Sequence, residues 1–165
     1  MIILGIDPGT ATTGFGVLRK SGKELEVLDY GCIETLPGTE PGERLKIIHQ
    51  ELNKLIEKHS PEMMAVENLF FFKNLKTAMP VSQAKGVILF TAAKKRIPVI
   101  EFTPLQVKMT IANYGRADKK QVQRMIQVIL NLEEKPKDKA KRKDDATDAL
   151  GIALCYALKS EVKFC

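Results

Sequence analysis

The chain of 165 residues is long enough for one compact domain with a hydrophobic core, because 44% of its residues are hydrophobic. It holds no apolar run of roughly 18 residues and no basic patch ahead of an apolar stretch, so we expect no membrane span, no signal peptide and a cytoplasmic protein. The net charge of +6 is compatible with a polyanionic partner, and the three scattered cysteines form neither a disulfide framework nor a zinc motif.

The first part of the chain predicts a three-stranded meander followed by a helix. Short apolar segments, separated by breaks that contain glycine, predict strands over residues 2–6, 14–20 and 25–35. The connections are too short for a helical crossover, so these strands are expected to run antiparallel. Leucine and isoleucine then recur at helical spacing and predict an amphipathic helix over residues 41–59.

The rest of the chain alternates strands with helices. Strands are predicted over residues 61–67 and 97–102, and helices over residues 78–96, 104–113, 119–132 and 144–160. This order predicts an α/β fold, in which helices flank a mixed five-stranded sheet made of the antiparallel meander and further parallel strands. We expect residues 1–160 to form a single domain and residues 161–165 a short C-terminal tail.

Acidic residues stand at two strand ends and at the start of the last predicted helix. Asp7 and Glu67 each follow an apolar strand, and sites in open α/β sheets form outside the carboxyl ends of parallel strands. Asp145 and Asp148 are three residues apart in the last helix and can therefore point to one spot. Asp144 is rotated from Asp145 by about 100° and should point elsewhere.

Four carboxylates in one place would favour a metal site. Like charges raise each other's pKa unless cations neutralise them, and a cluster of oxygen ligands without cysteine or histidine suits Mg²⁺ or Mn²⁺. Two such ions, about 3.5–4 Å apart, would activate a water and stabilise the leaving oxygen of a phosphodiester. The pattern therefore predicts a metal-dependent nuclease. His49 and His59 lie far from these acids in the sequence and are expected at the surface.

Each acid also has a simpler structural explanation. An aspartate before Pro-Gly, as at Asp7, is often only a turn residue. Glu67 could pair with a lysine, and acids in the first turns of a helix stabilise the helix dipole. Only the combination of two strand-end acids with an acidic pair opening the last helix favours one shared site.

The chain resembles RuvC-type Holliday-junction resolvases over nearly its whole length. The blocks that carry the resemblance are ILGIDPGTATTGFGV, AVENLFFFKN, QAKGV, YGRADKKQV and DDATDALGIAL. Their order and spacing are specific, whereas no single block would be. The catalytic and metal-binding acids of that family fall on Asp7, Glu67, Asp145 and Asp148. Asp144 is additional and is expected to cap the helix.

The resemblance implies a fold, an activity and partners. The family has an RNase H-like fold, and its members are homodimers that depend on Mg²⁺, for which Mn²⁺ can substitute, with two ions expected in each site. They make paired nicks in two strands of like polarity at four-way DNA junctions during recombination and repair, and they work with a branch-migration motor. For this chain the resemblance implies a location in the bacterial cytoplasm, in association with the nucleoid.

The resemblance also implies residues that contact DNA. An aromatic residue just after the glutamate engages bases near the crossover, which falls on Phe70, and stacking of an unpaired base there would contribute about 1–3 kcal/mol. Functional lysines of the family fall on Lys108 and Lys119, and we expect phosphate contacts from Lys73, Arg116 and Lys120. The basic run over residues 135–143 is expected to act as an electrostatic arm over DNA phosphates.

The helix predicted over residues 78–96 is the candidate for the dimer interface. It carries the small residues Ser82, Ala84 and Gly86, and the interface of the family lies in this region. Glycine inside a helix costs about 1 kcal/mol relative to alanine, which close approach of a second helix would offset. Packing of the same helix on its own sheet is the alternative, and the sequence does not separate the two.

Parts of the sequence also fit functions other than junction resolution. An RNase H-like nuclease acting on RNA, as in rRNA processing, shares the opening motif. A nucleotide-binding domain of the actin-like ATPase type would also explain GIDPGT, but it needs two such domains, and no second Asp-x-Gly loop follows an apolar strand. A non-catalytic nucleic-acid-binding domain would be expected to have lost at least one acid, and all four are present.

Overall fold

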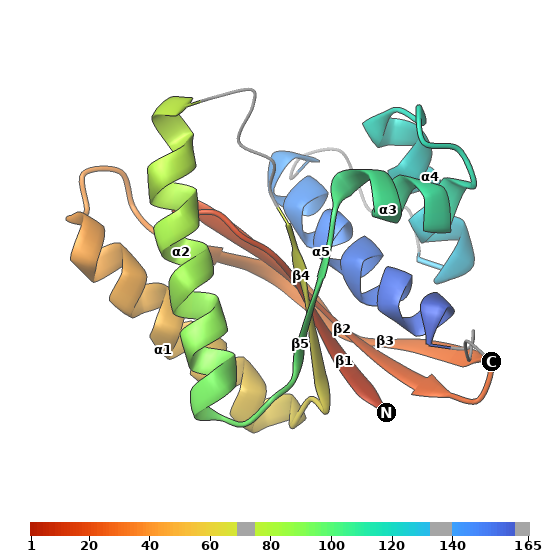
Figure 1. Ribbon diagram of the computed structural model, residues 1–165, viewed down its shortest axis with the longest axis horizontal. Helices are drawn as coiled ribbons and strands as arrows, with labels where there is room; N and C mark the ends of the chain where they lie inside the picture. Colours follow the sequence, from red (N-terminus) through yellow and green to blue (C-terminus); the bar gives the residue numbers. More distant parts are fainter. Residues whose placement is uncertain (69–74, 133–139, 161–165) are drawn as a thin grey trace.

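The computed structural model describes residues 1–68, 75–132 and 140–160, apart from the side chains of 75–77 and 140–143. Its strands form one mixed sheet in the order β3-β2-β1-β4-β5 (Figure 1). They are β1 (Ile2–Asp7), β2 (Thr12–Ser21), β3 (Glu24–Glu34), β4 (Met63–Glu67) and β5 (Val99–Phe102). β1, β2 and β3 form the antiparallel meander, and β4 pairs in parallel with both β1 and β5. The mixed five-stranded sheet predicted from the sequence is confirmed.

Helices cover both faces of this sheet. In the described residues they are α1 (Pro41–His59), α2 (Leu75–Lys94), α3 (Pro104–Ala112), α4 (Lys119–Ile129) and α5 (Ala140–Lys159). α1 and α2 pack together on one face, and α5 crosses the other face with α3 and α4 packed against it (Figure 1). Among these helices, none combines the length and the apolar character needed to cross a membrane.

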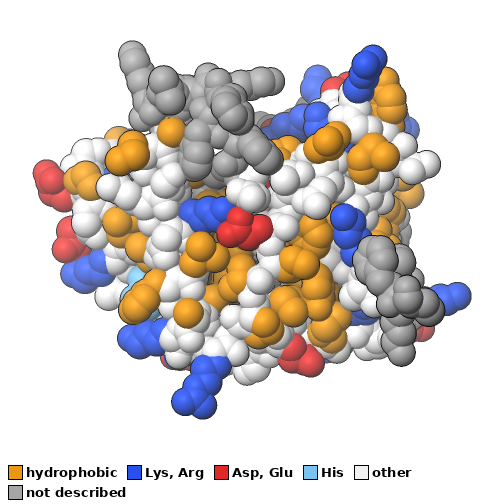
Figure 2. Space-filling view, viewed as in Figure 1, with side chains coloured by type: hydrophobic (Ala, Val, Ile, Leu, Met, Phe, Trp, Pro, Cys, Tyr) orange, Lys and Arg blue, Asp and Glu red, His pale blue; other side chains and the backbone are white. Residues whose placement is uncertain are grey.

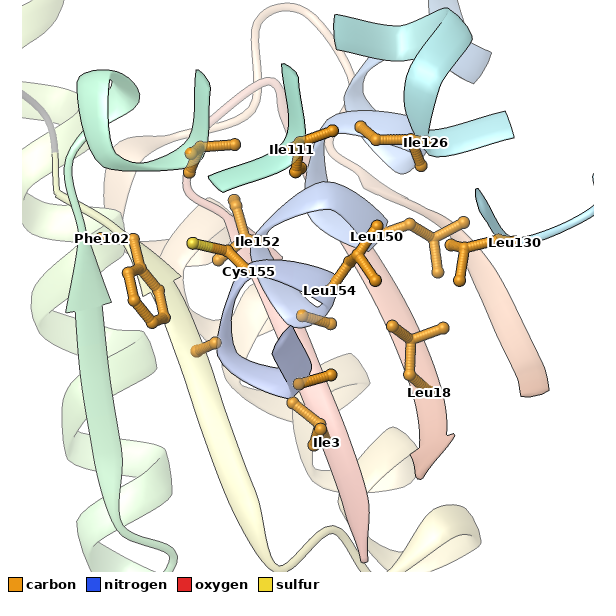
Figure 3. Packing of buried hydrophobic residues seen from close by; sticks show 14 of the residues in the cluster. Ile3, Leu18, Phe102, Ile111, Ile126, Leu130, Leu150, Ile152, Leu154 and Cys155 are labelled. Carbon is orange, nitrogen blue, oxygen red and sulfur yellow. The ribbon is translucent and has the colours of Figure 1, made fainter. Parts of the chain in front are cut away.

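The side chains of β1 contribute to both hydrophobic clusters of the core, because successive side chains of a strand point to opposite faces of the sheet. Leu4 and Ile6 belong to the cluster under α1 and α2, whereas Ile3 belongs to the cluster under α5. Figure 3 shows Ile3 in this second cluster together with Leu150 and Leu154 of α5. The same alternation directs the last residue of β1 toward α5.

Several helix boundaries differ from the sequence prediction. α2 begins at Leu75 instead of residue 78, and α5 begins at Ala140 instead of residue 144. Alanine, lysine and arginine are favourable helix residues, so residues 140–143 extend α5 upstream. Asp144 therefore lies inside α5, and the prediction that it caps this helix is wrong.

Both histidines are less exposed than predicted. Nε2 of His59 lies 2.9 Å from Oδ2 of Asp29 in β3, and the His59 side chain is only 10% exposed. Nδ1 of His49 lies 2.7 Å from Oγ1 of Thr91 in α2. The two side chains thus join α1 to the sheet and to α2, because each finds a polar partner on a neighbouring element.

Candidate active site

The ends of two neighbouring parallel strands bring Asp7 and Glu67 together. Ile6 pairs with Val66 in the register of β1 and β4, so the residues that follow them lie side by side. Ile6 and Val66 face α1 and α2, and alternation therefore turns Asp7 and Glu67 toward α5. A side-chain hydrogen bond joins the two carboxyl groups.

Glycines in the sheet allow α5 to approach and add two more carboxylates. Gly14 of β2 pairs with Asp7, and a Cβ at Gly14 would collide with the backbone of Asp145. A Cβ at Gly5 would collide with the α5 backbone one turn further along. As a result, one carboxylate oxygen from each of Asp7, Asp145 and Asp148 lies within 4.8 Å of the other two.

The electrostatics of this acidic cluster are unfavourable without a counter-charge. Burial raises the pKa of Asp7 well above its ordinary value, and the nearby charges of Glu67, Asp148 and Asp145 raise it further. Burial also raises the pKa of Glu67, partly offset by its hydrogen bond with Asp7. Carboxylates held this close attract cations.

A lysine and a glutamine of helix α4 contact the carboxylate of Asp148. Nζ of Lys119 lies 2.7 Å from Oδ2 of Asp148, and Nε2 of Gln123 donates to its Oδ1 at 3.0 Å. Burial lowers the pKa of Lys119, but the contact with Asp148 outweighs this and the net pKa is raised. A capping box between Asp118 and Gln121 defines the start of α4, so Lys119 is its first residue.

A cavity of about 190 Å³ lies beside the acids. Its charged lining residues are two acids, Glu67 and Asp148, and two lysines, Lys108 and Lys119. The remaining lining is apolar and comes from Pro104, Val107, Val122, Ile126 and Ile152. The cavity therefore combines carboxylates with cations that can hold an anionic group next to them.

The donor set fits a hard divalent cation. Among the described residues, the group with metal-ligand spacing consists of Asp7, Asp145 and Asp148, all carboxylates. Oxygen ligands without histidine or cysteine suit Mg²⁺ or Mn²⁺ better than zinc. Glu67 lies outside that group of three but contacts it through Asp7.

Comparison with known proteins agrees with this geometry. A family model described as crossover junction endodeoxyribonuclease RuvC matches residues 3–156. The chain belongs to the RuvC family. A relative of that description from Halothermothrix orenii is 50% identical over 156 residues, which cover 94% of this chain and 92% of the relative. One from Moorella thermoacetica is 52% identical over 157 residues, covering 95% and 91%.

A solved structure extends the match to three dimensions. The structure described as T. thermophilus RuvC in complex with Holliday junction substrate is 34% identical to this chain. The match covers 97% of this chain and 94% of that one, with a TM-score of 0.86. The RuvC family and the RNase H-like fold predicted from the sequence are confirmed.

The residues of this RuvC family member that were predicted to contact DNA differ in their positions relative to the cavity. Lys108 and Lys119 line the cavity, as described above, whereas Arg116 and Lys120 are exposed near the start of α4. Phe70, Lys73 and residues 135–139 of the basic run lie outside the described residues. Their predicted DNA contacts stay predictions.

Gln123 is a site residue that the sequence reading missed. It follows Lys119 by four residues, and residues at this spacing share one face of a helix. Once Lys119 was placed at the start of a helix beside the acids, this periodicity would have indicated Gln123. A search for charged residues does not indicate Gln123, because glutamine carries no charge.

Proposed function

We propose that this chain is a metal-dependent endonuclease that resolves four-way (Holliday) DNA junctions by paired nicks in strands of like polarity, in recombination and repair. The proposal depends on one observation above all: Asp7, Asp145 and Asp148 converge within 4.8 Å, with Glu67 hydrogen-bonded to Asp7. Membership of a family of crossover junction endodeoxyribonucleases supports the reaction, and the junction complex of the T. thermophilus relative supports the substrate.

Mg²⁺ is the proposed cofactor, with Mn²⁺ as a substitute and two ions in each site. Asp7, Glu67, Asp145 and Asp148 would hold them, because hard cations prefer carboxylate oxygens. When bound, such ions polarise the phosphodiester, activate a water and stabilise the leaving oxygen. Burial and the repulsion from neighbouring carboxylates both raise the pKa of Asp7, and the repulsion also favours binding of a cation by the cluster.

The neighbouring side chains would bind and orient the phosphate. Lys119 stands at the N-terminus of α4, where the helix dipole favours an anion, and its side chain is 55% exposed. Lys108 lines the same cavity and adds a second ammonium group. Gln123 would keep Asp148 oriented by holding Oδ1 while Lys119 contacts DNA.

A homodimer is the proposed active form, since a two-fold protein can present two identical sites to a junction with two equivalent strands. Hydrophobic side chains are exposed on the part of the surface that α2 covers (Figure 2). Met79 is 70% exposed and Phe90 is 61% exposed. A Cβ at Gly86 would meet nothing within 4 Å, so this position is open to a second chain.

Further contacts with DNA and with other proteins follow from family membership. We propose that Phe70 engages bases at the crossover and that Lys73, Arg116 and Lys120 contact phosphates. A branch-migration motor is the proposed protein partner, and the bacterial cytoplasm is the proposed location, because junctions form there on the chromosome.

The proposal is tested by comparing three labelled substrates in Mg²⁺: a synthetic four-way junction, a linear duplex of the same sequence, and an RNA–DNA hybrid. We expect cleavage of the junction alone, at symmetric positions in two strands of like polarity. Equal cleavage of all three would contradict junction selectivity while sparing the nuclease class. Cleavage confined to the hybrid would favour an RNA-processing nuclease instead.

A further inference from the structure

Lys85 of α2 occupies a partly buried polar site behind the end of β4. Its Nζ lies 2.6 Å from Oε2 of Glu101 in β5 and donates to Oδ1 of Asn68 at 3.2 Å. The Lys85 side chain is only 15% exposed and that of Glu101 is 34% exposed. We propose that Lys85 and Glu101 are positioning residues for Glu67 and act through Asn68. This inference depends on the proposed catalytic role of Glu67.

The end of β4 shows how such positioning works. Alternation sends Val66 toward α1 and α2, Glu67 toward the acidic cluster and Asn68 back toward α2. Val66 pairs with Glu101 in the register of β4 and β5, so Glu101 also faces α2. The side chains of these two adjacent residues therefore point to opposite faces of the sheet. Glu67 points to the active site, and Asn68 points to α2.

Asn68 is held by two independent contacts. Its backbone N–H donates to the carbonyl of Phe102 at 2.8 Å, which continues the β4–β5 ladder one residue beyond Glu67. Its side chain accepts from Lys85, whose helix packs on that face of the sheet. The backbone on the C-terminal side of Glu67 is thus fixed to β5 and to α2, which limits how far the Glu67 carboxylate can move.

The burial of Lys85 distinguishes this contact from ordinary surface ion pairs. Burying most of a lysine side chain is costly unless polar partners compensate its charge for the lost water, and here a carboxylate and an amide oxygen do so. Loss of Lys85 would leave Glu101 without this partner and Asn68 without this donor. Because catalytic groups must be held within about 0.5 Å, even a small shift of Glu67 would slow the reaction.

A second ion pair next to α2 provides a matched control. Nζ of Lys95, the residue after α2, lies 3.0 Å from Oε1 of Glu57 in α1. Its side chain is 33% exposed, that of Glu57 is 67% exposed, and the pair joins the two helices rather than α2 to the sheet end. Lys95→Met removes the same charge and the same kind of contact without touching Asn68.

The experiment compares Lys85→Met, Lys85→Arg and Lys95→Met in the full chain. The readouts are junction affinity without divalent ions, single-turnover cleavage at saturating protein, and Mn²⁺ binding measured by calorimetry without DNA. We expect Lys85→Met to cleave about 10-fold more slowly and to bind Mn²⁺ several-fold more weakly, with junction affinity within about 2-fold of the parent. Lys85→Arg should recover most of both losses, and Lys95→Met should behave like the parent.

Three results would overturn the inference. The first is cleavage and Mn²⁺ binding by Lys85→Met at parental levels, and the second is equal losses in Lys95→Met. The third is a loss of junction affinity that accounts for the whole loss of rate, which would make Lys85 a DNA contact. If the parent chain cut no junction, the proposed function would fail, while the calorimetry would still show whether Lys85 positions the metal-binding carboxylates.

Glu101→Gln distinguishes a positioning role of Lys85 from a direct contact with phosphate. It also replaces Lys85→Met as the test variant if Lys85→Met does not fold. If Lys85 positions Glu67, this variant should cleave more slowly with unchanged junction affinity, because the ion pair is weakened. If Lys85 contacts phosphate instead, removing the carboxylate should tighten junction binding without slowing cleavage, and the positioning role is rejected.

Discussion

The backbone of Asp145 packs directly against Gly14, the residue paired with Asp7 across β1 and β2. This contact places the α5 acids over the strand-end acids. A Cβ on Gly14 would stand 2.6 Å from the carbonyl carbon of Asp145, so no methyl group fits without moving α5. The glycine is therefore part of the active-site geometry although it has no side chain.

Gly14→Ala is expected to lower the free energy of unfolding by about 1–3 kcal/mol, because overpacking forces the backbone apart. It should also weaken Mn²⁺ binding, since Asp145 and Asp148 would move away from Asp7. Urea unfolding and calorimetry measure the two effects. Gly42→Ala is the control, because a Cβ at Gly42 in α1 meets nothing within 4 Å. Equal stability of the two variants would contradict the close approach.

Asp7→Asn should retain junction binding and abolish Mg²⁺-dependent nicking. The substitution keeps the size of the side chain but removes a negative charge from the centre of the cluster, where Asp7 contacts Glu67 and lies near the α5 acids. Gel-shift titration without divalent ions measures binding, and single-turnover assays measure nicking. Normal cleavage by this variant would show that the site has been assigned to the wrong residues.

Lys119→Met and Lys120→Met should separate a site residue from a surface contact. Lys119 contacts Asp148 at 2.7 Å and is proposed to hold the phosphate beside the acids, so its loss should lower the single-turnover cleavage rate by about 100-fold. Lys120 is exposed, and its loss should weaken junction binding. The slope of log affinity against log salt concentration should fall by about the amount expected for one phosphate contact, and the single-turnover cleavage rate should stay the same. A similar loss of rate in both variants would argue against a special role for Lys119.

Phe90→Glu should dissociate the proposed dimer. Phe90 is 61% exposed on α2, and a carboxylate there would be buried against the second chain at a prohibitive cost. Sedimentation should show a monomer, and junctions should be nicked in one strand rather than in pairs. Leu36→Glu, at a residue that is 76% exposed outside α2, should remain dimeric. A dimeric Phe90→Glu variant would exclude this face as the interface.

Asp29→Asn tests a structural ion pair away from the active site. Burial of Asp29 raises its pKa, but hydrogen bonds from Lys58 and His59 outweigh this, and the net pKa is lowered. A lowered folded-state pKa stabilises the protein above the unfolded value of about 3.9, and this stabilisation is lost as pH falls through the folded value. The variant should therefore be less stable than the parent by about 1 kcal/mol at pH 7, and the difference should shrink in acid.

Chemical unfolding across the acid range measures this dependence. A stability difference that stays constant down to the lowest pH would show that Asp29 contributes through packing instead of charge.

Local signals in the sequence were sufficient for most of the fold. Apolar runs and helical periodicity identified every strand and helix of the described residues, and the short connections predicted the antiparallel meander. Helix boundaries are predicted less accurately: the charged residues before Asp144 resemble a loop and so predict a cap at Asp144, although lysine and arginine also extend helices. The four acids were identified from their positions at strand ends and at helical spacing.

How these acids meet depends on contacts that no local pattern in the sequence encodes. The strand register places Asp7 beside Glu67, and the missing side chains of Gly5 and Gly14 allow α5 to approach, so the distances depend on contacts between segments far apart in the chain. The same holds for Gln123 and Asn68, which are uncharged and acquire their roles from partners on other elements. Sequence patterns report local periodicity and chemistry, whereas close approach depends on how the sheet and helices pack.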